Sequence, residues 1–126
     1  MKDEINRVLA LPSFDRDELL KTIDEDVGLC IEIIGVFREE AAALISVMDD
    51  AIANENSQQI ARAAHSLKGS ALTIAAGQVA GLAHLLEDMG GNHDLEMAKQ
   101  VFVHLEAAYE ELEKIFDAML PRKEGA

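Results

Sequence analysis

His65 is the residue of this 126-residue chain whose sequence surroundings best suit chemistry. On a helical wheel with about 100° per residue, the apolar residues of its segment fall roughly 160° to 240° away from it. These residues are Ile60, Ala63, Leu67, Ala71 and Ile74. His65 is therefore expected to face solvent. An imidazole is largely uncharged at neutral pH, and its ring nitrogen lone pair is then a nucleophile.

Two cationic and two small residues share the predicted face of His65. Arg62 and Lys68 lie three positions before and after it, and Ala61 and Gly69 lie four positions before and after it. The cations can neutralise the oxygens of a phosphoryl group beside the imidazole. A glycine inside a helix costs about 1 kcal/mol relative to alanine. Gly69, together with Ala61, is therefore interpreted as clearance for a second protein that approaches the imidazole.

Glu87 is the residue expected to orient the imidazole. The helix that carries His65 and the following helix form a hairpin with its turn near Ala76, and antiparallel pairing about this point sets residue 65 opposite residue 87. A carboxylate there can accept the proton of one ring nitrogen and leave the other free to attack. A register shifted by one turn would pair other residues, so this contact is a hypothesis. Leu72, two turns after His65, extends the same open face.

The helices that must position these residues are predicted from apolar periodicity and capping signals. The predicted segments are Asp3–Leu11, Asp15–Thr22, a long helix after Thr22 that ends near Ala53, Ser57–Ala76, a shorter helix with apolar residues from Val79 to Met89, and Leu95–Met119. Thr22 with Glu25, and Asn56 with Gln59, have the spacing of capping pairs. Asp94 is placed to cap the last helix, which Pro121 is expected to end.

Four substantial amphipathic helices joined by short polar turns cannot bury their apolar sides singly. The predicted fold class is therefore all-α, an up-down-up-down antiparallel four-helix bundle with one or two short N-terminal helices. Residues 1–14 are predicted to form a short helix and linker, residues 15–120 the bundle, and residues 121–126 a solvated tail.

The amino-acid composition excludes several classes of function and partner. Hydrophobic residues make up 49% and charged residues 28%, as in an ordinary globular domain. The formal charge of −13 repels nucleic-acid backbones and anionic lipids, so neither nucleic acid nor a membrane is an expected partner. The single cysteine, Cys30, cannot form an internal disulfide, and the N-terminus lacks the apolar stretch of a secretion signal. A cytoplasmic location is expected, with Cys30 in the core.

The segment from Ala64 to Ala71, AHSLKGSA, resembles the signature of histidine-containing phosphotransfer (HPt) domains. The similarity extends from about Asp15 to Leu120 and includes the pattern LAHLLE from Leu82 to Glu87. In that family the matching histidine accepts a phosphoryl group from a receiver-domain aspartate and passes it to another aspartate. The resemblance therefore implies that His65 is the phosphohistidine of a two-component phosphorelay.

The resemblance also assigns roles to neighbours of the histidine. Lys68 resembles the lysine that lies beside the phosphate, Gly69 the glycine that leaves clearance, and Ser70 the small polar residue after it. One position departs from the family pattern. Where many members have a glycine before an alanine near the end of this helix, the chain has Ala75 and Ala76, which puts the tightness of that turn in doubt.

The partners implied by the resemblance are a hybrid sensor histidine kinase and the receiver domain of a response regulator. The sequence has no Gly-x-x-x-x-Gly-Lys-Ser/Thr motif and no other glycine-rich nucleotide loop, so a carrier without an ATP site or autokinase activity is expected. No cofactor is expected on the chain itself, because the Mg²⁺ ion belongs to the partner receiver domain. The chain is expected to be a monomer.

Two alternatives belong to other classes. A di-iron bundle requires Glu-x-x-His pairs on two helices, but no histidine has a glutamate three positions earlier and no His-x-x-x-His pair occurs. No metal site is therefore predicted, and His84, His93 and His104 are interpreted as solvated residues. A non-catalytic helical adaptor or scaffold remains the alternative, although it leaves the helical Gly69 and the exposed His65 unexplained.

Overall fold

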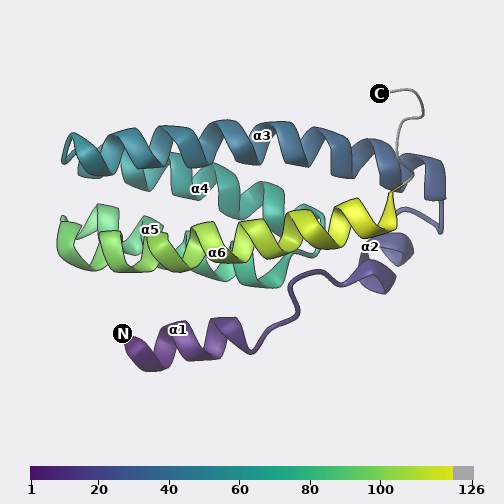
Figure 1. Ribbon diagram of the computed structural model, residues 1–126, viewed down its shortest axis with the longest axis horizontal. Coiled ribbons are helices and arrows are strands. Elements are labelled where there is room, and N and C mark those ends of the chain that lie inside the picture. Colours follow the sequence, from purple (N-terminus) through teal and green to yellow (C-terminus); the bar gives the residue numbers. More distant parts are fainter. Residues whose placement is uncertain (121–126) are drawn as a thin grey trace.

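The computed structural model describes residues 1–120, and all regular secondary structure within them is helical. The helices are α1 (Lys2–Leu9), α2 (Arg16–Thr22), α3 (Val27–Ala53), α4 (Ser57–Thr73), α5 (Gly77–Gly91) and α6 (Leu95–Met119). Figure 1 shows the long helices α3 to α6 running back and forth along one axis, with α1 and α2 outside them. The all-α class and the helical bundle are confirmed. Pro121 and the predicted tail lie outside the described residues.

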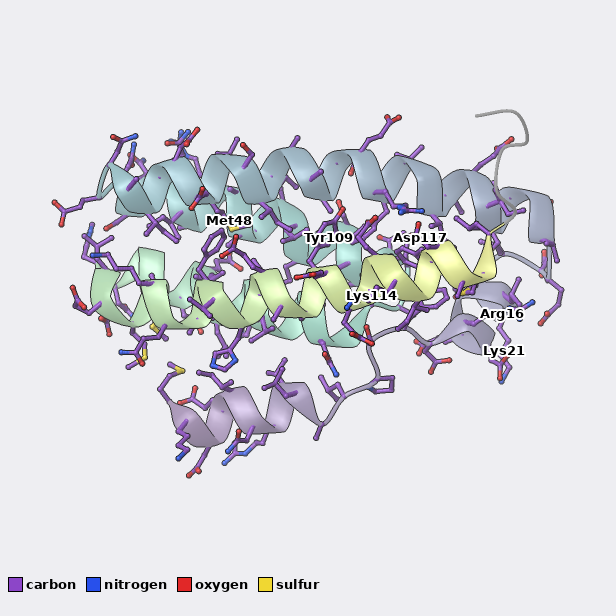
Figure 2. All side chains as sticks on the ribbon, in the orientation of Figure 1. Arg16, Lys21, Met48, Tyr109, Lys114 and Asp117 are labelled. Carbon is purple, nitrogen blue, oxygen red and sulfur yellow. The ribbon has the colours of Figure 1, made fainter. Side chains whose placement is uncertain are left out.

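The core lies between the four long helices. Figure 2 shows Met48 of α3 between α3 and α6 and shows Arg16 and Lys21 of α2 pointing outward. Met48 is fully buried, as are the largest apolar side chains of the other long helices. These include Ile34, Ile60, Leu67, Leu82, Leu86, Leu105, Leu112 and Phe116. None of the helices described is long and apolar enough to cross a membrane.

Side-chain caps set where most helices begin. The carboxamide of Asn56 accepts the backbone N–H of Gln59 at 3.1 Å, and the carboxylate of Asp94 accepts that of Met97 at 3.2 Å. Both predicted caps are therefore present. The predicted capping pair at Thr22 is wrong, because Thr22 is the last residue of α2. Asp26 caps α3 instead, and its carboxylate accepts the N–H of Leu29 at 3.0 Å.

The turn between α4 and α5 contains a strained residue. Ala75 has a φ of 60°, in the left-handed region that a residue with a Cβ rarely adopts. The prediction that this helix continues to Ala76 is therefore wrong, and α4 ends at Thr73. The turn is nevertheless tight, because the N–H of Ala75 bonds to the carbonyl of Leu72 at 3.2 Å and that of Ala76 to the carbonyl of Ala71 at 2.9 Å.

Helices α4 and α5 make the most extensive contact in the bundle. Both helices carry small buried residues, among them Ala64 of α4 and Ala83 of α5. A Cβ added at Gly90 would lie 2.8 Å from both the backbone nitrogen of Ala61 and the carbonyl oxygen of Ser57. Glycine is therefore required at this point, and the close approach fixes the register of α5 against α4.

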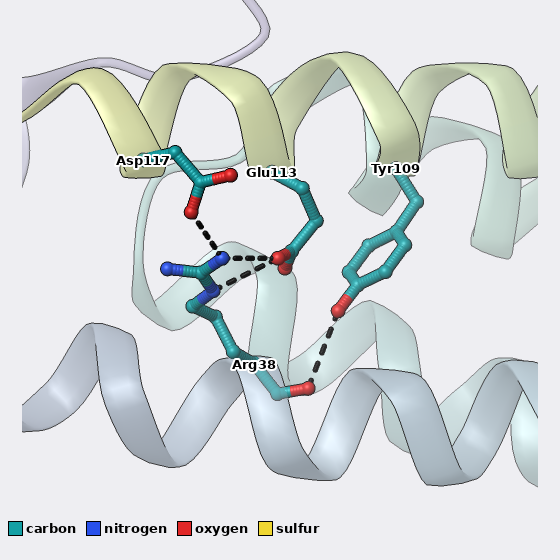
Figure 3. Close-up of polar contacts among 4 residues, drawn as sticks. All are labelled: Arg38, Tyr109, Glu113 and Asp117. Carbon is teal, nitrogen blue, oxygen red and sulfur yellow. Dashed lines mark hydrogen bonds and ion pairs between the residues drawn. The ribbon is translucent and has the colours of Figure 1, made fainter. Parts of the chain in front are cut away.

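A polar cluster bridges α3 and α6 (Figure 3). Arg38 donates from Nε and Nη2 to one carboxylate oxygen of Glu113, at 2.9 and 2.5 Å, and from Nη2 to Asp117 at 2.7 Å. The hydroxyl of Tyr109 donates to the carbonyl oxygen of Arg38 at 3.2 Å. Burial, together with the neighbouring Glu113, raises the pKa of Tyr109, so this hydroxyl stays a donor at any physiological pH. The cluster joins the first and last long helices.

The N-terminal helix α1 packs on α5. A Cβ added at Gly81 would lie 2.6 Å from a methyl group of Val8, so this glycine makes room for α1. The side-chain amide of Gln78 donates to the carbonyl oxygens of Leu9 and Leu11, at 3.1 and 2.8 Å. The segment that follows α1 is thereby attached to the start of α5.

The positive φ of Ala75 leads to a prediction about stability. Ala75→Gly should raise the free energy of unfolding by about 0.5–1 kcal/mol, because glycine adopts left-handed geometry without the Cβ penalty and this gain exceeds its larger unfolded-state entropy. Urea denaturation of both proteins measures the difference. The matched control is Ala42→Gly at an exposed position inside α3, which should lower the free energy of unfolding by about 1 kcal/mol. Equal losses for both variants would contradict the strain at Ala75.

Candidate functional site

His65 lies near the middle of α4, and 68% of its side chain is exposed. The apolar residues predicted to lie opposite are all buried, namely Ile60, Ala63, Leu67, Ala71 and Ile74. The orientation predicted from the helical wheel is therefore the one observed. One face of α4 packs in the bundle, and the face that carries His65 is open to a second molecule.

Glu87 of α5 contacts both His65 and Lys68. Its carboxylate oxygen Oε2 lies 2.8 Å from Nδ1 of His65, and its other oxygen, Oε1, accepts a hydrogen bond from Nζ of Lys68 at 2.7 Å. The hairpin register predicted from the sequence therefore brings Glu87 to His65. The bond between Glu87 and Lys68 was not predicted, because a wheel of α4 alone places Lys68 beside His65 without showing what else it meets.

The electrostatics of this trio fix which ring nitrogen is free. The ammonium group of Lys68, and to a smaller extent His65, hold the pKa of Glu87 below its ordinary value of 4.5, although partial burial opposes them. Glu87 is thus a carboxylate at neutral pH and can only accept hydrogen bonds. In the neutral imidazole, Nδ1 must therefore carry the proton. The lone pair then resides on Nε2, which has no hydrogen-bond partner within residues 1–120.

Arg62 and Ala61 lie on the same open face. Both line a shallow depression together with His65, Ser66 and Glu87. Arg62 is exposed and makes no ion pair with any part of the chain that the structure describes, so its guanidinium is open to an anion that enters this depression. Ala61 has a second reason to be small, since it lies against the backbone of α5 at the close approach described above.

Gly69 and Leu72 continue the open face toward the end of α4. A Cβ added at Gly69 would meet no atom within 4 Å, so no packing contact requires glycine there. Leu72 is 64% exposed. Ser70, in contrast, is not brought to His65. Five positions along a helix correspond to about 140° of rotation, and the hydroxyl of Ser70 donates to Glu40 of α3 at 3.0 Å.

The other histidines have no comparable surroundings. His84 of α5 is 57% exposed and lies 3.8 Å from Asp88, one turn further along the same helix. His93 is exposed in the turn before α6, and His104 is half-buried. Within residues 1–120, no group of three or more histidine, cysteine, aspartate or glutamate side chains is arranged to hold a metal ion.

The lowered pKa of Glu87 leads to a second prediction. Lys68→Met should raise this pKa toward its ordinary value, because Lys68 is the largest cause of the shift. His65→Gln should raise it less. A pH titration of the Glu87 side-chain carboxyl signal by ¹³C NMR measures both changes.

The sign of the effect on stability follows from the same shift. A carboxyl group whose folded-state pKa is lowered stabilises the fold above its ordinary pKa, and this contribution is lost as the pH falls through the lowered value. In Lys68→Met this contribution should therefore be smaller, and its loss should be complete at a higher pH than in the wild type. An unchanged titration curve for Glu87 would show that Lys68 does not hold its carboxylate.

A known protein family and a solved structure are similar to this chain. The family model described as Hpt domain matches residues 32–115. A crystal structure of histidine-containing phosphotransfer protein B (HptB) from Pseudomonas aeruginosa PAO1 is similar to this chain, with a TM-score of 0.78 and 20% sequence identity over 86% of this chain and 94% of that chain. No curated protein matches.

Proposed function

Since the chain belongs to the Hpt domain family, we propose that His65 is the residue through which it carries a phosphoryl group. The function of the family is histidine phosphotransfer in phosphorelays, and we assign this function to particular side chains of the chain. The observation that carries the proposal is the exposed imidazole of His65, whose Nδ1 is bound to Glu87 and whose Nε2 has no hydrogen-bond partner within residues 1–120.

In the proposed transfer, Nε2 of His65 attacks the phosphorus atom of an aspartyl phosphate on a receiver domain. The new Nε2–P bond forms as the P–O bond to the aspartate breaks, and the aspartate leaves as a carboxylate. No proton has to move at Nε2, because the proton of the neutral ring is already on Nδ1. The reverse transfer, from His65 to a receiver aspartate, uses the same groups in the opposite order.

Glu87 has two roles in this proposal. As an acceptor it selects the tautomer with the proton on Nδ1, so that the attacking nitrogen is the exposed one. It also lies against the positive charge that develops on the ring when Nε2 gives its electron pair to phosphorus. Its contact distance of 2.8 Å to Nδ1 already suits a charge-assisted hydrogen bond, so little rearrangement is needed.

Lys68 and Arg62 are proposed to neutralise the phosphoryl oxygens. An ammonium group has three donors, so Lys68 can bind a phosphoryl oxygen while it keeps its bond to Glu87. Arg62 approaches from the other side of His65, one turn earlier on α4. Ser70, which the sequence resemblance placed beside the phosphate, is left out of the proposed set because its hydroxyl is bound to Glu40.

Hpt proteins are phosphotransfer carriers that act with receiver domains and kinases. We further propose that this chain has no ATP site and no autokinase activity, so that its phosphoryl group always comes from a partner. The Mg²⁺ ion that phosphoryl transfer requires is then held by the receiver domain. The chain is proposed to act as a monomer in the cytoplasm, with a hybrid sensor histidine kinase on one side and a response regulator on the other.

A third prediction concerns the acceptor itself. His65→Gln should abolish uptake of radioactive phosphate from phosphorylated receiver domains and leave the fold intact, because the side chain is exposed and contributes little packing. The label on the wild type should be acid-labile and base-stable, as expected for a phosphorylated imidazole. His84→Gln is the matched control, since that histidine is similarly exposed and should be dispensable. Label retained by His65→Gln would refute the assignment.

A fourth prediction concerns clearance at Gly69. Gly69→Leu should fold at least as stably as the wild type, because its Cβ meets no atom and leucine has the better helix propensity. Transfer should nevertheless fall, and a misplacement of about 1 Å between the reacting atoms can cost on the order of 100-fold in rate. Thermal melting and transfer rates test the two parts.

The control for this prediction is Gly35→Leu in α3, where an added Cβ also meets no atom within 4 Å. It should gain stability without any loss of transfer. If Gly69→Leu unfolds, or if it transfers normally, Gly69 does not provide clearance for docking.

A further inference from the structure

Gly90, in the last turn of α5, is buried directly against the backbone of α4. An added Cβ would lie 2.8 Å from the carbonyl oxygen of Ser57 and from the backbone nitrogen of Ala61, and 3.0 Å from the Cβ of Ala61. In an α-helix, residues four positions apart provide the acceptor and the donor of one backbone hydrogen bond. The added methyl group would therefore press on a backbone hydrogen bond of α4, which cannot yield as a flexible side chain can.

This contact lies one turn away from the two side chains that meet at the candidate site. His65 follows Ala61 by four positions on α4, and Glu87 precedes Gly90 by three positions on α5. The two helices are antiparallel, so both steps lead in the same direction along the pair. The turn at Ala75, which joins the helices, lies ten positions from His65 on the other side. Of these two points that fix the helix separation, the contact at Gly90 is therefore the nearer one.

The carboxylate of Glu87 has little freedom to compensate for a larger helix separation. It is bound to two groups of α4 at once, at 2.8 Å to Nδ1 of His65 and at 2.7 Å to Nζ of Lys68. A Cβ at Gly90 reaches ordinary van der Waals contact only if its distance to the α4 backbone grows from 2.8 to 3.4 Å. The same shift carries Glu87 beyond about 3.2 Å from Nδ1, where an N–H···O bond weakens. The long side chain of Lys68 can follow the carboxylate, but the short imidazole side chain cannot.

We propose that Gly90 is a positioning residue for phosphoryl transfer, which holds α5 close enough to α4 for Glu87 to fix the tautomer of His65. This inference rests on the proposed function of His65. Gly90 touches no reacting atom and acts only through Glu87. When α5 is displaced, the ring is no longer held with its proton on Nδ1, and part of the population carries the proton on Nε2. In those molecules Nε2 has no free lone pair and cannot attack phosphorus.

Two other glycines of α5 provide matched controls. A Cβ added at Gly81 would lie 2.6 Å from a methyl group of Val8, so this glycine is equally crowded but faces α1 instead of α4. A Cβ added at Gly91 would meet no atom within 4 Å. All three glycines lie in the same helix, so replacement by alanine removes the same backbone freedom in each case. Only the replacement at Gly90 changes the separation of α4 and α5.

The first measurement is the tautomer of His65, read from the ¹⁵N chemical shifts of its ring at a pH where the ring is neutral. The wild type should carry the proton on Nδ1, whereas Gly90→Ala should show a substantial fraction with the proton on Nε2. Gly81→Ala should lower the free energy of unfolding and Gly91→Ala should not, and both should keep the wild-type tautomer. A wild-type tautomer in folded Gly90→Ala would overturn the proposal.

Glu87→Asp tests the same separation without touching the helix contact, and it decides the matter if Gly90→Ala does not fold. It shortens the side chain by one methylene group, which withdraws the carboxylate from Nδ1 while Gly90 stays in place. The variant should fold and should show a mixture of tautomers like that of Gly90→Ala. If its ring proton stays on Nδ1, the distance between α4 and α5 does not control the tautomer and the proposal fails.

The second measurement is single-turnover transfer from a purified phosphorylated receiver domain. Gly90→Ala should lower the rate at saturating receiver by roughly tenfold, because only molecules with a free Nε2 lone pair can attack. The receiver concentration at half-maximal rate should change by less than about threefold. In a Glu87→Ala background, Gly90→Ala should cause no further loss of rate, because no carboxylate is left to position. Equal losses in both backgrounds would show that Gly90 does not act through Glu87.

The proposed function and this inference fail in different ways. If the wild type carries its ring proton on Nδ1 but takes up no label from any phosphorylated receiver, the function proposed for His65 is refuted, and the role of Gly90 in transfer with it. If the wild type takes up label and folded Gly90→Ala does so at the wild-type rate, the role of Gly90 alone is overturned.

Discussion

The missing side chain of Gly90 is the constraint on which the candidate site depends. Its backbone lies so close to Ser57 and Ala61 that any Cβ would meet main-chain atoms, which cannot move aside as a flexible side chain can. This contact sets both the distance and the register between α4 and α5. Glu87 lies one turn before Gly90 on α5, and His65 lies one turn after Ala61 on α4. The hydrogen bond of 2.8 Å between them follows from that register.

The carboxylate of Glu87 binds both His65 and Lys68, and this sharing keeps the number of negative charges beside the imidazole low. A second acidic residue near His65 would repel an incoming phosphoryl group, and an isolated lysine would leave the tautomer of the imidazole undetermined. Among the described residues that line the depression at His65, Glu87 is the only acid. Lys68 and Arg62 therefore leave this surface with an excess of positive charge in a chain of net charge −13. This face therefore repels anions less than the rest of the acidic surface does.

The parts of the structure that sequence reasoning recovered are those set by local periodicity. The apolar spacing around His65 predicts its exposure, and a symmetric hairpin about Ala76 predicts its contact with Glu87. The features that the sequence did not predict depend on competition between two possible capping residues or on packing between distant segments. Thr22 and Asp26 both have capping side chains, and only the position of α2 decides between them. Ala75 has a left-handed conformation although it is not a glycine, and periodicity along one helix carries no signal for that.

Contacts between segments far apart in the sequence cannot be predicted from apolar periodicity. Gly81 is needed because Val8 of α1 lies against it, and Ser70 turns to α3 because Glu40 offers an acceptor there. Neither relation follows from spacing along one helix. In the proposed transfer, the chemical requirements are met by His65 and its immediate neighbours on α4 and α5, which are joined by short contacts.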